Sequence, residues 1–168
     1  MSGLLSRLLR RLRGGRGKTT GVRRLVWVIS PPTRSQLPVF LRSLPALMPA
    51  GSVLYLEGKP APEVQRYLEG RASDGVSSAG WDEYGDFVAR VALTADNLNG
   101  LAELAERLPS HDITFYLHVL HGSEYLLEWW DVPDNSIFMP RGSPKALVKA
   151  LCSPVGLKCR KMRIWHPA

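Results

Sequence analysis

The residues best equipped for chemistry gather in the C-terminal half of the chain. His118 offers an imidazole, a group that ordinarily titrates near neutral pH, while Glu128 offers a carboxylate and Arg141 a fixed cation. If the fold brings these three together, they form the acid, base and charge-stabilising groups of a small enzyme. They are therefore the candidate catalytic residues. A structural ion pair between Glu128 and Arg141 or Lys145 is the alternative interpretation.

The same region predicts a β-hairpin that would position these groups. Residues 113–120 and 124–130 are strand-like and meet at Gly122-Ser123, which suits a type II′ turn. Strict alternation from this turn places Ile113, Phe115, Leu117, Val119, Leu126, Glu128 and Trp130 on one face, and Tyr116, His118, Leu120, Tyr125, Leu127 and Trp129 on the other. Such strands lie mid-sheet with both faces covered, or else leave one face as an aromatic binding patch. The candidate binding residues are Tyr116, Tyr125, Trp129, Trp130 and Asp131.

A second group of carboxylates lies in a Ser-, Gly- and Asp-rich stretch that predicts a surface loop. Asp82, Glu83 and Asp86 stand beside Trp81 and Tyr84. Carboxylates so close together on a loop can bind a cation or act as an acid and base pair. The alternative is an acidic loop that is simply solvated.

Metal and cofactor motifs are missing from the sequence. His118 and His121 are three residues apart on a predicted strand, so they point to opposite faces. Cys152, Cys159 and His166 match no standard zinc spacing, and Cys152 falls on the apolar side of a predicted helix. No G-x-S-x-G, H-E-x-x-H or dinucleotide-binding fingerprint occurs. We expect neither a metal nor a cofactor.

Positive charge is concentrated at the N-terminus. The chain of 168 residues has a formal net charge of +7, but residues 1–56 hold ten Lys and Arg residues and no carboxylate. The remaining 12 basic and 15 acidic residues give −3. This asymmetry indicates a basic arm on a mildly acidic body, and it weighs against a nucleic-acid-binding domain with a basic face.

The first 21 residues predict an amphipathic helix followed by a linker. On a helical wheel the leucines at positions 4, 5, 8, 9 and 12 form one arc, opposite the arginines at 7, 10, 11 and 13. The candidate contact residues of this arm are Leu5, Arg7, Leu8, Arg10, Arg11, Leu12 and Arg13. A phosphate-binding loop is excluded, because the Gly of that motif is missing and no strand precedes it. A solvated tail, a membrane-surface helix and, in a eukaryote, a mitochondrial presequence stay open.

Residues 22–168 predict a single α/β (α+β) domain. Strands and helices alternate up to about residue 110, and a β-meander, a helix and a last strand follow. This order predicts a sandwich in which helices pack on a mixed sheet of about six strands, with the antiparallel hairpin and meander in the C-terminal half.

Two classes of function fit these features. The preferred hypothesis is a small, non-enzymatic binding or adaptor domain that contacts a protein partner, with the arm attached to an anionic membrane or acidic surface. A regulatory or toxin-neutralising role in a bacterium suits its size and charge. The alternative is a small enzyme with its site near His118, Glu128 and Arg141 or on the loop of residues 81–86. Two cysteines and no secretory signal favour a cytoplasmic, or peripheral membrane, location.

Overall fold

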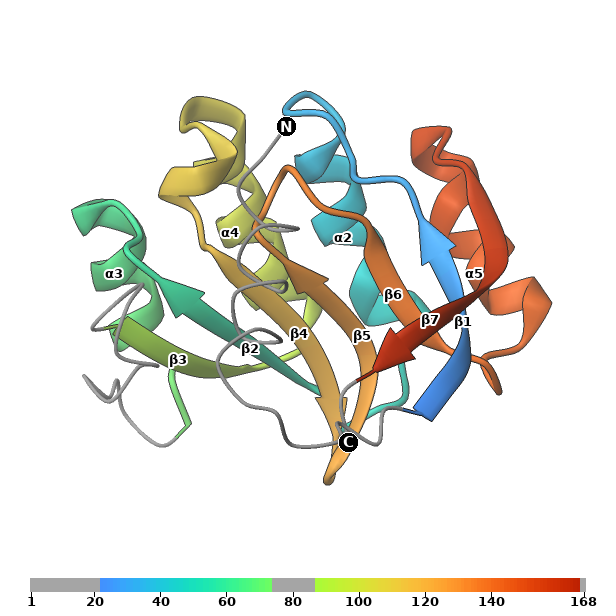
Figure 1. The fold of residues 1–168 in the computed structure, drawn as a ribbon. Coiled ribbons are helices and arrows are strands. Elements are labelled where there is room, and N and C mark those ends of the chain that lie inside the picture. Colours follow the sequence, from blue (N-terminus) through green and yellow to red (C-terminus); the bar gives the residue numbers. More distant parts are fainter. Residues whose placement is uncertain (1–21, 74–86, 167–168) are drawn as a thin grey trace, which may run out of the picture.

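The computed structural model describes residues 22–73 and 87–166, and in these residues four helices pack on a seven-stranded sheet (Figure 1). The strands are β1 (Val22–Ile29), β2 (Val53–Gly58), β3 (Phe87–Ala92), β4 (Tyr116–His121), β5 (Glu124–Trp130), β6 (Ile137–Pro140) and β7 (Cys159–His166). The helices are α2 (Leu37–Leu47), α3 (Pro62–Glu69), α4 (Ala95–Arg107) and α5 (Lys145–Cys152). Short 3-10 turns cover Ser110–Asp112 and Ser153–Val155.

The sheet order is β3-β2-β4-β5-β6-β1-β7, and every neighbouring pair is antiparallel. The predicted α/β sandwich with an antiparallel meander is confirmed. The sheet differs from the expected mixed one because β1 and β2, which α2 connects, do not pair. β4, β5 and β6 lie between them, so the crossover from β1 to β2 produces no parallel pair.

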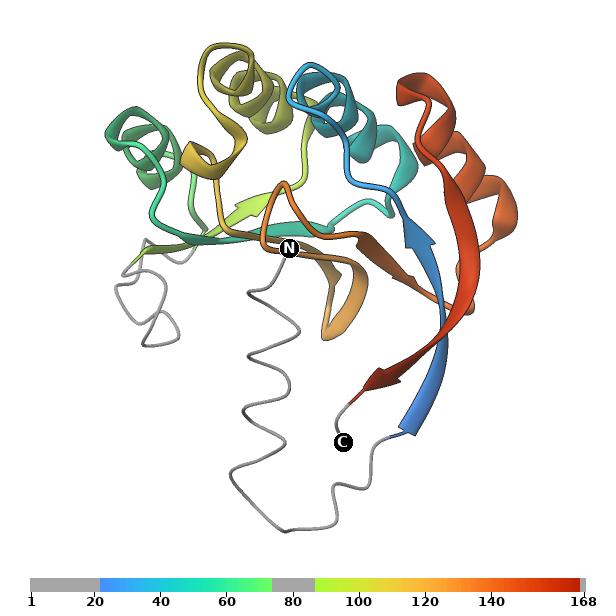
Figure 2. The same ribbon diagram turned by 45° about the horizontal axis from the view of Figure 1, so that its top comes forward.

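All four helices lie on the same face of the sheet (Figure 2). Helix α4 illustrates how the sequence sets such an element: the side chain of Thr94 caps its first turn by accepting a hydrogen bond from the Asn97 amide at 3.3 Å. Leu98, Leu101 and Ala105 then recur at three- and four-residue steps, and all three are buried. The apolar stripe of the helix therefore packs toward the sheet.

The core fills the space between the helices and this covered face. Trp129 of β5 is fully buried and meets Phe40 of α2 edge-to-face, with ring centroids 5.8 Å apart. Its indole Nε1 donates a hydrogen bond to the carbonyl oxygen of Asn135 at 2.8 Å. Trp129 thus joins the centre of the sheet to the helix layer and to the β5–β6 connection.

The hairpin has the predicted turn but not the predicted register. Gly122 has φ 58°, the positive value that the first central residue of a type II′ turn requires, and Leu120 faces Tyr125 as expected. Beyond that pair the register shifts: Val119 faces Leu127, so Leu126 is an extra residue on β5 and forms a β-bulge.

The bulge exchanges the two faces for the rest of β5. Leu127 and Trp129 join Leu117 and Val119 in the buried core. Glu128 and Trp130 move to the face of His118 and Tyr116, with His118 opposite Glu128 and Tyr116 opposite Trp130. The predicted placement of these four β5 residues was therefore wrong, because a period of two does not survive an inserted residue.

Candidate functional site

The second face of the sheet carries no helix among the described elements (Figure 2). One register row crosses all seven strands on this face: Arg90, Tyr55, His118, Glu128, Phe138, Val28 and Arg160. The rows beside it add Glu57, Tyr116 and Trp130 on one side, and Val53, Leu120 and Tyr125 on the other. We call this surface the open face.

Five rings on β2, β4 and β5 form an aromatic cluster at the centre of the open face: Tyr55, Tyr116, His118, Tyr125 and Trp130. His118 is its hub, with ring centroids 4.7 Å from Trp130, 5.5 Å from Tyr125 and 5.7 Å from Tyr55. Tyr116 stacks nearly parallel to His118 at 6.4 Å and meets Trp130 edge-to-face at 5.0 Å. Each ring thus touches at least one other member of the cluster.

The imidazole of His118 is buried by these neighbours. Its exposed fraction is 3%, and no atom of the described residues makes a hydrogen bond to Nδ1. Burial lowers the pKa of His118 to about 4, because the charged ring would lose its hydration without gaining a partner. His118 is therefore neutral at pH 7.

Tyr55 and Glu57 add a hydrogen-bonded pair to this face that sequence reasoning missed. The Tyr55 hydroxyl donates to Glu57 Oε2 at 2.6 Å, and Glu57 is 3% exposed. Burial, followed by the hydrogen bond to Glu57, raises the pKa of the Tyr55 phenol. The signal was present in the sequence, since Tyr55 and Glu57 alternate with the apolar Leu54 and Leu56 along one strand.

The structure brings together only part of the predicted catalytic set. His118 and Glu128 face each other on β4 and β5. Arg141 is exposed just after the end of β6, and no hydrogen bond or ion pair joins Glu128 to Arg141 or Lys145 among the described residues.

The predicted binding residues divide between the two faces. Tyr116, Tyr125 and Trp130 belong to the aromatic cluster, whereas Trp129 lies in the core. Asp131 follows β5 with φ 51°, and its Oδ2 accepts a hydrogen bond from Asn135 Nδ2 at 2.9 Å, so it helps to shape a turn. The acidic-loop candidates Asp82, Glu83 and Asp86 and the arm of residues 1–21 lie outside the described residues.

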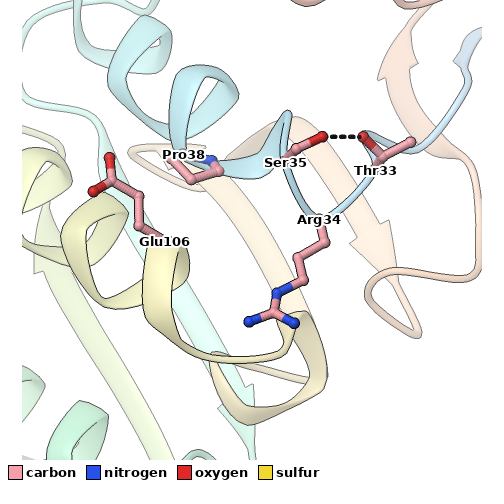
Figure 3. Close-up of a pocket in the computed structure, with 5 residues that line it drawn as sticks. All are labelled: Thr33, Arg34, Ser35, Pro38 and Glu106. Carbon is pink, nitrogen blue, oxygen red and sulfur yellow. Dashed lines mark hydrogen bonds between the residues drawn. The ribbon is translucent and has the colours of Figure 1, made fainter.

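A shallow hollow on the helix side offers no comparable chemistry. Figure 3 shows its lining, which consists of Thr33, Arg34, Ser35, Pro38 and Glu106. Glu106 pairs with Arg42 at 2.8 Å, while the guanidinium of Arg34 donates to the carbonyl of Arg107 at 3.1 Å. The charged side chains of the hollow are therefore engaged in contacts that hold α2 and α4.

Neither a metal centre nor a membrane span emerges from the described chain. No cluster of three or more His, Cys, Asp or Glu side chains occurs in residues 22–73 and 87–166. Over the same ranges, every helix is too short or too polar to cross a bilayer. Cys152 and Cys159 are free thiols, and Cys152 is buried.

Comparisons with known proteins found no match for this chain, whether among protein-family models, curated proteins or solved structures. Its class therefore follows from its own geometry: an α+β protein with one unclosed antiparallel sheet, helices on one face and an aromatic cluster on the other.

Proposed function

We propose that this protein is a non-enzymatic binding module that docks a protein partner on its open face. The observation that supports this most is the exposure of two rings at the edge of the aromatic cluster: Trp130 is 41% exposed and Tyr125 is 48% exposed. Trp and Tyr are the side chains most enriched at the energetic centres of protein interfaces. Tyr and Trp have only two side-chain torsions each, so ordering these rings on binding costs little entropy.

The same cluster favours binding over catalysis. His118 is neutral at pH 7 and surrounded by rings, so it is a poor proton donor for a bound substrate. Among the described residues no ion pair joins its register partner Glu128 to the predicted cation, Arg141. The enzyme alternative would need a further catalytic group from the loop of residues 81–86.

The arm supplies the second half of the proposal, attachment to an anionic surface. Residues 1–21 contain six Lys and Arg residues, no carboxylate and a run of leucines at helical spacing. Such a segment binds anionic headgroups through its cations and the acyl boundary through its leucines. A cytoplasmic adaptor, regulatory or toxin-neutralising protein held at a membrane would use both surfaces at once.

Partner binding is tested by substitutions on the open face of the full chain. We expect Trp130→Ala and Tyr125→Ala each to weaken a purified partner's affinity by about tenfold or more, the effect of losing a ring at an interface centre. The matched control is Val39→Ala on α2, whose side chain is similarly exposed at 43% but lies on the helix layer. A partner that binds all three variants like the wild type would contradict the proposal.

Membrane attachment is tested by co-sedimentation with vesicles of phosphatidylglycerol and phosphatidylcholine. The full chain should bind, and binding should fall between about 50 and 500 mM NaCl because surface charges are screened. Replacing Arg7, Arg10, Arg11 and Arg13 by Ser, or deleting residues 1–21, should abolish it. Equal binding by the wild type and these variants would discard the attachment hypothesis.

A further inference from the structure

The centre of the open face has the chemistry to bind a cationic amphipathic segment. On the open face, strands β4 and β5 carry one carboxylate, Glu128, and no Lys or Arg. Glu128 lies in the register row of His118 and is only partly buried. An aromatic surface beside a carboxylate binds leucines through apolar contact and arginines through cation–π and ionic contact.

The chain itself contains a segment of this kind. The leucines at positions 4, 5, 8, 9 and 12 and the arginines at 7, 10, 11 and 13 occupy opposite arcs of a helix. A helix of residues 4–13 would be about 15 Å long. That length matches about three strand spacings, so one such helix would cross β5, β4 and β2, the strands that carry the aromatic cluster.

The start of β1 is placed so that this segment can reach the open face. Val22 and the β4–β5 turn at Gly122 lie at the same end of the sheet (Figure 1). Only β6 separates β1 from β5, so the lateral distance is two strand spacings, about 10 Å. Residues 14–21 can span up to about 27 Å when extended, which leaves enough chain to turn back over Tyr125 and Trp130.

We infer that residues 4–13 dock in cis on the open face, with their leucines on Tyr125 and Trp130 and with Arg11 and Arg13, which border the leucine arc on the helical wheel, toward Glu128. A short linker gives the arm a millimolar effective concentration at this surface, which favours its own chain over a second copy. The docking stands independently of any partner. Its consequence rests on the proposed function: the arm covers the partner surface until an anionic membrane draws it away.

The test follows the two neighbouring tryptophans of β5 in the full chain. 5-Fluorotryptophan gives each Trp its own ¹⁹F signal, which single Trp→Phe variants assign, and a neutral gadolinium chelate broadens the signals that solvent can reach. Leu5→Ser, Leu8→Ser and Leu12→Ser together should at least double the broadening of Trp130. Trp129 is fully buried on the other face, so its signal should be unchanged and reports that the variant is folded.

A second substitution acts from the sheet side. Glu128→Arg places a cation against the arginines of the arm, so it should expose Trp130 as the leucine variant does, while Glu124→Arg at the hairpin tip is the matched control with the same change of charge. Equal broadening of Trp130 in the wild type and in both the leucine and Glu128 variants would overturn the docking.

Dilution and vesicles separate the remaining outcomes. If twentyfold dilution of the wild type exposes Trp130, a second copy supplies the arm and the cis arrangement is overturned; unchanged broadening supports it. Phosphatidylglycerol vesicles should raise the broadening of Trp130 to the level of the leucine variant. If the leucine variant exposes Trp130 but the vesicles do not, the docking is supported and the proposed competition by the membrane is wrong.

Discussion

Lowering the pH should destabilise the folded chain through His118. In the folded protein burial lowers the pKa of this imidazole to about 4, whereas a histidine in an unfolded chain titrates near 6.5. Between about pH 6.5 and pH 4, His118 binds a proton in the unfolded state but not in the folded state. The free energy of unfolding therefore falls as the pH drops from 6.5 toward 4, and it is unaffected by this residue above pH 7.

The size of the effect follows from the difference between the two pKa values. A difference of 2.5 pH units corresponds to a full loss of about 3 kcal/mol, of which about 2.5 kcal/mol is reached at pH 4.5. The titratable groups facing His118 are Tyr55, Tyr116, Tyr125 and Glu128. A carboxylate near an imidazole favours its charged form, but burial lowers the pKa of His118.

Urea unfolding followed by circular dichroism at pH 7.0, 5.5 and 4.5 measures this loss, with the wild type compared to His118→Phe. The Phe variant keeps a ring in the cluster but cannot titrate, so its stability should fall by about 2.5 kcal/mol less than the wild type between pH 7.0 and 4.5. His111→Phe is the control, because its side chain is 69% exposed. If the wild type and His118→Phe lose the same stability within about 0.5 kcal/mol, the imidazole is not buried as described.

Three further predictions test the register, a close backbone approach and a buried thiol. Trp129→Phe should lower the free energy of unfolding by about 2 kcal/mol, because a hydrogen bond is lost and a small cavity forms. Trp130→Phe should lower it by less than about 1 kcal/mol. If the bulge were absent, the same urea unfolding would show the reverse order. Gly58→Ala should lower the free energy of unfolding by at least about 2 kcal/mol in the same assay, because φ of Gly58 is 149° and a Cβ would lie 2.7 Å from the Phe115 nitrogen. An unchanged stability would contradict this close contact between the two backbone segments. Burial, and to a smaller extent the neighbouring Cys159 thiol, raises the pKa of Cys152 to about 12. Iodoacetamide at pH 8 should therefore alkylate Cys152 about 100-fold more slowly in the folded chain than in urea. Equal alkylation rates by mass spectrometry would refute this prediction.

The sequence predicted local structure well and long-range pairing poorly. Apolar alternation located the strands, and a Gly-Ser pair located the hairpin turn. The bulge left no signal, because Leu126 and Leu127 are both apolar and either can face the core. The pairing of β1 with β6 and β7 was also hidden, since it joins residues more than 100 positions apart in the chain.

The bulge and the sheet order decided how much of the candidate site was predicted. Tyr116, His118 and Tyr125 were placed on one face because they lie on the turn side of the bulge or on the unbulged strand β4. Trp129 and Trp130 were each predicted on the wrong face because they lie beyond the bulge. Tyr55 was missed for a different reason: only the sheet order brings β2 beside β4 and places its ring against His118.

The composition of the open face supports the proposal that this face binds a partner. An antiparallel sheet with helices on one side needs only polar side chains on the other. Here that side holds exposed Tyr and Trp rings around an imidazole whose Nδ1 is unpaired among the described residues. A phenyl ring at position 118 would fill the same space without the cost of burying a polar group. A histidine at the hub of an aromatic cluster therefore lowers stability without helping the sheet to form, a cost that the proposed binding of a partner to the open face would explain.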